Sequence, residues 1–376
     1  MHFRVRVTLT LAAAAACTAL GACGSSSGSS SAPATSATAA ATPAALGGQS
    51  SYRALQSLYK QAKAAGQHSV VIYGPSAGTD TPLYEQFHRD FPAITVTGVP
   101  VVGPPMTAKV SAEVGSGKHV GDIAYTGNTD MLAYAAHGWL TPYKPSILPP
   151  PSQLPPETVG PGNAFVGTSF AVPGVIYNTT QVPASKVPKT WQALLDPAWK
   201  GKMAMYYPTV VGEMADVFAH LDASSQFSGV MAGLHSQDVQ LTPATNITGP
   251  VTAVAQGAKS LGIAVPFAFY LGAKKAGAPL GFTLLDSGNY TVTLYMGLLK
   301  GAPDPLAARV YESWLFTPQA AKVIAAEGAY SALRGSPSPT GLPSYSSINF
   351  LKPIPFSQVE SADNGAIQAA KKYWGG

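Results

Sequence analysis

Strand-like and helix-like segments alternate along the chain from residue 69 to residue 138. Residues 69–73 form a short apolar run that Gly74-Pro75 ends, as expected of a buried parallel strand. Thr81-Pro82 then offers an N-cap and a proline at the first helical position, and large apolar residues follow at intervals of four. This alternation predicts an α/β fold with a mainly parallel sheet.

The strand–turn–helix unit recurs twice. We predict further strands over residues 94–98 and 121–125, and helices over 52–65, 106–114 and 130–137. Ligands of such sheets bind beyond the carboxyl ends of the strands. The loops that follow Tyr73, Gly98 and Tyr125 are therefore expected to carry the function.

The rest of the chain continues the pattern after an irregular, proline-rich connection over residues 145–161. A second α/β segment is predicted over residues 165–281, with strands over 170–177 and 203–207, a helix around Trp191 and a helix over 248–258. A further strand and helices follow from Tyr290. At 376 residues the chain exceeds what one hydrophobic core usually supports, so we expect two lobes.

The charge balance argues against nucleic acid as a partner. The sequence holds 23 Lys and Arg against 18 Asp and Glu, a net charge of +5, and its basic residues are scattered. A phosphate-binding surface needs a concentrated basic patch. With 46% hydrophobic and 11% charged residues, the composition also excludes a charged disordered tail and a coiled coil.

Both cysteines lie near the N-terminus, where the sequence predicts an export signal. Residues 1–22 combine an early basic region with an apolar stretch that is too short and alanine-rich for a membrane span. Leu20-Gly21-Ala22-Cys23 resembles a bacterial lipobox, which implies cleavage before Cys23 and a lipid on its thiol. A plain secretory signal, with Cys23 incidental, is the alternative. With the lipid, the protein would be anchored to the extracellular face of the cell membrane without spanning it.

Residues 23–49 are predicted to comprise the lipidated cysteine and a flexible tether. From Gly24 onward the segment is almost entirely Gly, Ser, Ala, Thr and Pro, and it has no charged residue. Such a segment cannot bury enough apolar surface to offset its backbone entropy. The folded body is therefore expected to begin near residue 50.

Four stretches of the body resemble one family when they are taken in order. They are residues 71–79, 117–122, 194–202 and 301–308. Together they resemble the extracellular solute-binding proteins of bacterial ABC importers, in the type II cluster whose members bind ferric iron, thiamine, polyamines, phosphonates or sugar phosphates. The resemblance extends over residues 66–335.

The resemblance implies the architecture of a type II periplasmic binding protein. Two α/β lobes would be joined by two crossover strands, and the cleft between them would close on a solute. The first lobe would comprise residues 50–170 and 290–376, and the second lobe residues 171–289. The expected partners are a small-molecule solute and the transmembrane subunits of an ABC permease, and the protein itself is expected to be a monomer.

Five residues of the first lobe are candidate ligand contacts. Ser76, Gly78 and Thr79 follow the first strand and precede a helix, and Thr126 and Asn128 follow the third strand. Free N–H groups at a helix N-terminus, together with its positive dipole end, suit a carboxylate, phosphate or phosphonate. The alternative is that these residues form ordinary turns and helix caps.

The candidates in the second lobe are Tyr206, Tyr207, Asn246 and Tyr270. Tyr206 and Tyr207 end a predicted strand, where the related proteins place cleft residues. Adjacent side chains point to opposite faces of a strand, so we expect at most one of the two to face the ligand. Asn246 precedes a predicted helix that could present a second anion-binding N-terminus.

We predict a small anionic or polar solute, such as a phosphonate or a sugar phosphate, and no cofactor or bound metal. The resemblance implies that ferric binders use neighbouring tyrosines of the second lobe, whereas residues 267–270 offer only Tyr270. Fe(III) needs several anionic oxygens, which disfavours direct ferric coordination unless Tyr206 and Tyr207 substitute. A polyamine would require inward carboxylates, for which Glu213 and Asp80 are the nearest candidates.

A secreted serine esterase is the alternative from another functional class. Gly74-Pro75-Ser76-Ala77-Gly78 matches the G-x-S-x-G nucleophile pattern and lies between a predicted strand and helix. Hydrolases of this type place their histidine late in the chain, whereas the last histidine here is His235. The histidines also lack zinc-binding spacing. We therefore predict a binding protein and not an enzyme.

Overall fold

The computed structural model describes residues 41–375, except Ser76, Thr79, Ser146, residues 151–153, Pro156 and Ala244. These residues belong to one compact unit, Ala39–Gly376. The predicted signal peptide, Cys23 and most of the predicted tether lie outside the described residues. The last part of that tether is packed: Leu46 is fully buried, and the Ala45 carbonyl accepts a hydrogen bond of 2.9 Å from the Gln319 N–H. The folded body thus begins several residues before the expected boundary.

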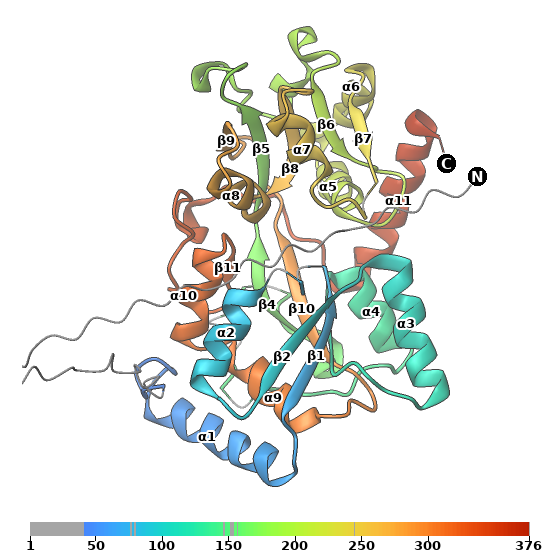
Figure 1. The fold of residues 1–376 in the computed structure, drawn as a ribbon. Coiled ribbons are helices and arrows are strands. Elements are labelled where there is room, and N and C mark those ends of the chain that lie inside the picture. The colour runs from blue at the N-terminus through green and yellow to red at the C-terminus, as the bar shows by residue number, and fades with distance from the viewer. Residues whose placement is uncertain are drawn as a thin grey trace, which may run out of the picture. The chain divides into compact units, whose positions relative to one another are not determined.

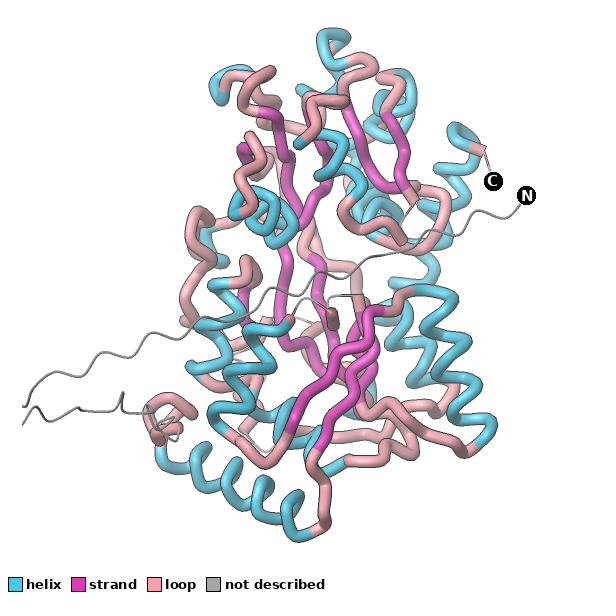
Figure 2. Tube along the Cα trace, in the orientation of Figure 1, coloured by secondary structure: helices cyan, strands magenta, loops and turns pink. Residues whose placement is uncertain are grey.

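Two mixed sheets organise this unit, and the chain passes between them (Figures 1 and 2). The first sheet has the order β11-β4-β10-β3-β1-β2. Its strands are β1 Ser69–Gly74, β2 Thr95–Pro100, β3 Ile123–Thr126, β4 Val166–Ala171, β10 Val292–Leu298 and β11 Tyr330–Ser331. We call this sheet and its helices the first lobe.

The second sheet is built from the intervening part of the chain. Its order is β7-β6-β8-β5-β9. Its strands are β5 Pro173–Asn178, β6 Met203–Tyr206, β7 Gln240–Thr242, β8 Leu261–Pro266 and β9 Leu280–Thr283. This sheet and its helices form the second lobe, so the structure confirms the predicted two-lobe α/β fold.

Helices cover both faces of the first sheet (Figure 1). They are α1 Gln49–Ala64, α2 Thr81–Asp90, α9 Pro305–Trp314 and α10 Pro318–Ala326 on one face, and α3 Gly103–Ser116 and α4 Asn128–Ala136 on the other. Side-chain alternation in β1 sends Ile72 into the first helical layer and Tyr73 into the second. A sheet buried on both faces explains the continuous apolar run in β1.

Aromatic side chains fill the layer between the first sheet and α2 and α9. The Phe87 ring lies 5.0 Å from that of Tyr311 and 5.4 Å from that of Trp314, both edge to face. The Trp314 indole N–H donates a hydrogen bond of 2.8 Å to the buried Asp90 carboxylate. Aromatic rings in a protein core favour edge-to-face contacts, and a buried indole N–H needs a hydrogen-bond acceptor. Both conditions are met here.

The second lobe uses α5 Glu213–Asp222 and α6 Val230–Ser236 on one face, and α7 Gly249–Ala255 and α8 Phe267–Lys275 on the other. The C-terminal helix α11, Phe356–Trp374, packs against α4 of the first lobe and against α5 and α6 of the second. Near its end the Trp374 ring stacks on Phe218 at 6.0 Å. The last helix therefore contacts both lobes, although the sequence assigned it to the first lobe alone.

Several predicted elements differ from the structure. The prediction of a helix around Trp191 is wrong, because the chain next to Trp191 forms a three-residue 3-10 helix, Ala193–Leu195, and no α-helix. The strand expected over residues 170–177 is divided at Val172 between β4 and β5, and α7 is shorter than expected. None of the helices in the described part of the chain is both long and apolar enough to cross a membrane.

Because Glu312 is buried, we predict that the free energy of unfolding depends on pH and that substitution of Glu312 removes this dependence. Glu312 is 2% exposed, and burial raises its pKa to about 8, with Arg309 opposing the shift. The folded state therefore holds a proton that the unfolded state releases above a pKa of about 4.5, so this stabilisation is present at acid pH and is lost as the pH rises towards 8. We expect Glu312→Gln to become more stable relative to wild type by about 2–4 kcal/mol between pH 5 and pH 8.

Urea unfolding at a series of pH values measures this difference. Glu85→Gln is the matched control, because the Glu85 side chain is 64% exposed and meets Arg89 only at 4.0 Å. Parallel profiles for wild type and Glu312→Gln would contradict the prediction.

Candidate functional site

The two crossover segments fix the direction of the strands in the first sheet. β4 passes into β5 through Val172 alone, so the carboxyl end of β4 points to the second lobe. β10 pairs antiparallel with both β3 and β4, and β1 and β2 run parallel to β3. Gly74, Pro100 and Thr126, which end β1, β2 and β3, therefore lie at the edge that faces the second lobe.

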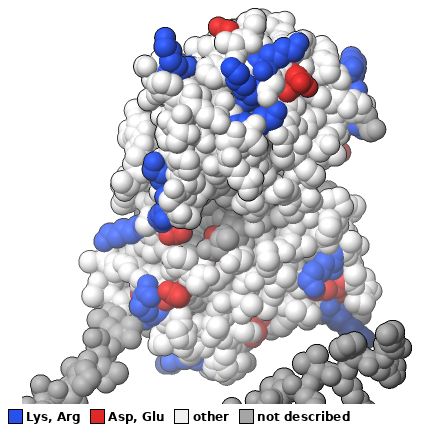
Figure 3. Space-filling view, turned by 45° about the horizontal axis from the view of Figure 1, so that its top comes forward, with Lys and Arg blue, Asp and Glu red and all other residues white. Residues whose placement is uncertain are grey.

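The second sheet has the matching arrangement. Pro173 at the start of β5 is paired with Pro266 at the end of β8, so β8 ends next to the first lobe. β6 and β7 run parallel to β8 and end at Tyr206 and Thr242. The carboxyl ends of six parallel strands thus face one another between the lobes. Figure 3 shows a hollow in this region, with acidic side chains inside it.

The loop after β1 is folded closely onto β2. A Cβ atom added to Gly98 of β2 would lie 1.8 Å from the Ala77 carbonyl oxygen, so only glycine fits there. Gly78 lies against Pro100, where a Cβ would be 3.3 Å from the proline ring, and Gly78 is exposed. Ser76 and Thr79, which were predicted to bind the ligand from this loop, lie outside the described residues.

The predicted residues after β3 are at the same edge, but their side chains are engaged locally. The buried Thr126 hydroxyl donates a hydrogen bond of 2.9 Å to Asp130. The Asn128 side-chain oxygen accepts one of 2.8 Å from the Thr129 N–H. Gly74 brings this segment next to β1, since a Cβ on Gly74 would lie 2.3 Å from the Tyr125 carbonyl.

In the second lobe, the structure separates the two adjacent tyrosines. Tyr206 is 4% exposed, belongs to the core and donates a hydrogen bond of 2.6 Å to the Ile247 carbonyl. Tyr207 is 38% exposed, and its N–H bonds the Thr242 carbonyl at 2.9 Å. These bonds bring residues 206–207 and 242–247 together, and Asn246 there is exposed.

Tyr270 belongs to a different cluster. It lies in α8, half-buried, with its ring 5.3 Å from that of Phe267 and 5.4 Å from that of Phe282. Burial raises the pKa of its phenol, and Tyr177 adds to the shift. The described residues contain no group of three or more His, Cys, Asp or Glu side chains arranged to hold a metal ion.

Two acidic residues at the facing edges are more enclosed than solvated helix residues would be. Burial raises the pKa of Asp80, just before α2, to about 7, and Glu327 adds to the shift. Burial likewise raises the pKa of Glu213 at the start of α5 to about 8. One Glu213 carboxyl oxygen is buried without a hydrogen-bond partner among the described residues. The sequence named both residues but could not show their burial, because the enclosing side chains come from distant segments.

Polar contacts also connect the lobes directly. Asp363 of α11 accepts a hydrogen bond of 2.7 Å from Thr129 of α4, and Asp216 of α5 accepts one of 3.0 Å from Tyr290. Asp216 and Asp363 are themselves hydrogen-bonded, and burial followed by the charge of Asp363 raises the pKa of Asp216 strongly. Asp216 therefore keeps its proton and donates to Asp363.

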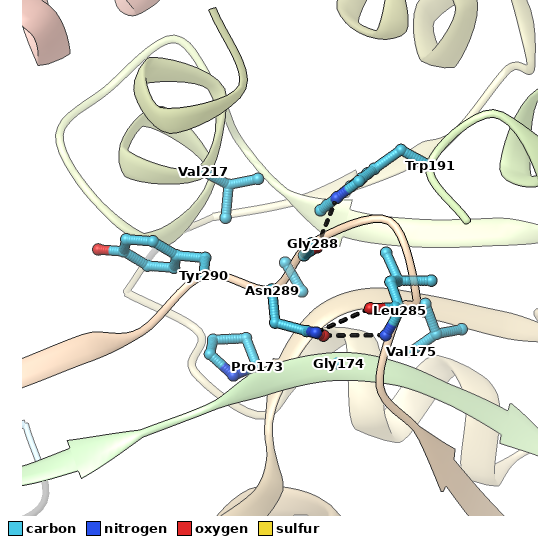
Figure 4. Close-up of a pocket in the computed structure, with 10 residues that line it drawn as sticks. Pro173, Gly174, Val175, Trp191, Val217, Leu285, Gly288, Asn289 and Tyr290 are labelled. Atoms are coloured by element: carbon cyan, nitrogen blue, oxygen red, sulfur yellow. Dashed lines mark hydrogen bonds between the residues drawn. The ribbon is translucent and has the colours of Figure 1, made fainter. Parts of the chain in front are cut away.

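Two cavities lie beside the crossover between β9 and β10. Figure 4 shows the smaller one, where Trp191 donates to the Gly288 carbonyl at 3.0 Å and Asn289 binds both backbone groups of Leu285. Its volume of about 10 Å³ suits one water molecule. The larger is a groove of about 620 Å³ lined by residues such as His220, Asp286 and Lys352. Neither of these two cavities includes a predicted ligand-binding residue.

Solved structures share this fold at low sequence identity. Iron-bound HitA from Pseudomonas aeruginosa is 18% identical with a TM-score of 0.65, over 80% of this chain and 99% of that one. A substrate-binding protein of an ABC transporter from Agrobacterium tumefaciens is 16% identical with a TM-score of 0.68, over 81% and 94%. AfuA from Actinobacillus pleuropneumoniae, with fructose-6-phosphate bound, is 18% identical with a TM-score of 0.66, over 82% and 98%.

The sequence itself matches a family model. None of the curated proteins compared with the chain matches it. Residues 122–352, more than half of the chain, match the model of the bacterial extracellular solute-binding proteins. This family is not enzymatic, so the esterase alternative built on Ser76 is set aside. Two α/β lobes with facing strand ends and this match lead to one conclusion: the chain belongs to the bacterial extracellular solute-binding proteins and serves an ABC importer.

Proposed function

We propose that the protein captures a small polar organic solute between its lobes and presents it, with the lobes closed, to the importer's transmembrane subunits. The observation that carries this proposal is the meeting of six strand carboxyl ends between two sheets. Loops at such ends expose backbone groups and small side chains, and they bind ligands in open α/β sheets. Closure by a hinge at the two crossovers follows from the same arrangement.

The candidate contacts come from both edges. Ser76, Gly78 and Thr79 would approach the solute from the loop after β1, and Thr126 and Asn128 from β3 and α4. Because the Thr126 hydroxyl and the Asn128 carbonyl oxygen are already bonded within the chain, we assign the backbone groups of that segment to the solute. In the second lobe, the exposed Tyr207 and Asn246 are better placed than Tyr206 or Tyr270.

The chemistry of these groups favours an organic solute over a bare ferric ion. Tyr206 donates its phenol proton to a carbonyl, and Tyr270 packs in a separate aromatic cluster. Tyr206 and Tyr270 therefore do not supply the paired tyrosinates that Fe(III) would need. The negative charge that the sequence suggested for the solute stays a prediction, and Asp80 and Glu213 at the edges weigh against it.

Binding of a solute is expected to stabilise and compact the folded unit, Ala39–Gly376. A thermal-shift screen would use fructose 6-phosphate, 2-aminoethylphosphonate, ferric citrate, thiamine and spermidine. A probe at 100 times its Kd adds about 2.7 kcal/mol, or roughly 2–4 °C in Tm. Small-angle scattering of the stabilised complex should show a smaller radius of gyration; a bound probe without compaction would contradict capture by lobe closure.

The loop after β1 can be displaced by one methyl group. Gly98→Ala would drive a Cβ into the Ala77 carbonyl, and we expect at least a tenfold loss of affinity for the probe that the screen identifies. Gly115→Ala is the matched control, because nothing lies within 4 Å of its added Cβ on α3. Calorimetric titration measures both variants, and equal affinity for Gly98→Ala and wild type would remove this loop from the site.

We further propose that Cys23 carries a lipid that holds the protein at the cell membrane. Cys23→Ser is expected to release the protein from the membrane fraction into the soluble fraction, because the thiol that receives the lipid is absent. Cys17→Ser lies in the same N-terminal segment and should remain membrane-bound. Release of both variants, or of neither, would contradict a lipid on Cys23.

A further inference from the structure

Four side chains from three separate segments meet in the first lobe beside the interlobe edge. Asp80 and Tyr84 are four residues apart at the start of α2, and so lie on one face of that helix. Tyr125 comes from β3 and Tyr311 from α9. The Tyr84 and Tyr311 rings are 6.0 Å apart and inclined by 62°. We call these four residues the Asp80 cluster.

The cluster has a buried floor and a partly open rim. Tyr311 is fully buried and Tyr125 is 6% exposed, whereas Asp80 and Tyr84 are half-buried. The rim lies next to the second lobe, because Glu327, whose charge acts on Asp80, lies 3.8 Å from Lys275 of α8. A group bound between the lobes can therefore reach Asp80 and Tyr84 first and the deeper phenols behind them.

Hydrogen-bonding capacity in the cluster is unused. The Tyr84 and Tyr311 hydroxyls are buried and have no hydrogen-bond partner among the described residues. The Tyr125 hydroxyl has one contact, at 3.2 Å, with the Ser169 hydroxyl. Buried polar groups in native proteins are nearly always paired, so two buried phenols that lack a partner among the described residues indicate a missing one.

The electrostatics identify the charge of that partner. Burial first, and then the negative charge of Glu327, raise the pKa of Asp80; among the described residues no Lys or Arg opposes this shift. Asp80 in turn raises the pKa of Tyr84, Tyr125 and Tyr311, after the larger effect of burial, so these phenols remain neutral. An anion would be repelled here, whereas a cation that donates hydrogen bonds would satisfy the carboxylate and the phenol oxygens together.

We propose that the Asp80 cluster is the subsite for an ammonium group of the transported solute. An ammonium has three donors, which match the Asp80 carboxylate and the oxygens of Tyr84 and Tyr311, and the rings of these two tyrosines lie 6.0 Å apart in the same cluster. Among the described residues, the cluster belongs to no group of three or more His, Cys, Asp or Glu side chains that could hold a metal ion. The inference rests on the proposed interlobe capture and narrows the solute to a class that contains a primary or secondary amine.

Two probes of equal length separate charge from shape. Putrescine carries an ammonium at each end, and 1,4-butanediol carries hydroxyls in the same places. Titration calorimetry of residues 39–376 at pH 8 should detect putrescine binding at least tenfold tighter than butanediol. Asp80→Asn should reduce that preference at least tenfold. Glu85→Gln removes an exposed carboxyl from the same helix and should leave the preference unchanged.

The pH dependence provides a second readout. With a pKa of about 7, Asp80 must lose its proton when an ammonium binds, so putrescine affinity should fall about 30-fold from pH 8 to pH 5.5. Protons should be released on binding, and the measured heat should change with the ionisation enthalpy of the buffer. The other titratable groups facing Asp80 are Glu327 and the three cluster phenols.

Tyr311→Phe distinguishes an ammonium subsite from a pocket that holds only an ordered water. If the hydroxyl is reserved for the solute, its removal should weaken putrescine binding about three- to tenfold and leave the Tm of the free protein unchanged or raised. A lowered Tm with unchanged affinity would indicate an ordered water alone and would overturn the inference.

Two further results would overturn the inference. One is that the protein does not prefer putrescine over butanediol. The other is that Asp80→Asn has a normal melting curve and keeps the preference. Lobe compaction with fructose 6-phosphate in that case would leave the proposed capture function standing. If no probe binds and no probe compacts the protein, the result would instead count against the proposed capture of a solute.

Discussion

The path of the chain between the lobes determines where everything else lies. Because β4 continues into β5 through one residue and β10 returns antiparallel to β4, the direction of each sheet is set by the crossovers. Every parallel strand then ends at the interlobe edge, and the loops after β1, β3, β6 and β8 are brought together although they are far apart in sequence. The match to the solute-binding family and the shared fold of HitA and AfuA agree with this arrangement.

The interlobe region also contains several carboxyl groups that are enclosed by the protein. Asp80, Glu213 and Asp216 all lie near the boundary, and burial is the main cause of the raised pKa of each. Isolated carboxylates are costly to bury, so each must keep a proton or acquire a partner. Asp216 has a partner in Asp363, which fastens α5 to the C-terminal helix. Among the described residues, Asp80 has neutral phenols and the like-charged Glu327 around it and no cation that lowers its pKa, which is why its environment points to a ligand.

Local patterns predicted the strands and helices well where apolar runs and prolines mark them. The run at residues 69–73 became β1, and Thr81-Pro82 begins α2 as expected. The patterns failed where distant contacts decide: Trp191 is fixed by a hydrogen bond to Gly288, and Leu46 is buried in the first lobe despite its polar, tether-like neighbours. For the candidate site, the sequence located the strand ends at which the loops begin. It could not show that the side chains of Tyr206 and Thr126 form hydrogen bonds within the protein. The enclosure of Asp80 by Tyr125 and Tyr311 depends on three separate segments, so no local pattern reveals it.

The position of β10 also governs when the first lobe can form. This strand lies between β3 and β4 in the sheet, yet it is made only after the entire second lobe has been synthesised. Until it arrives, β3 and β4 each present an unpaired edge, and the sheet cannot close. Pairings over such long sequence separations form slowly. For a protein that works outside the cytoplasm, this delay keeps the nascent chain unfolded for longer, and an unfolded chain is the form that can be threaded through a membrane channel.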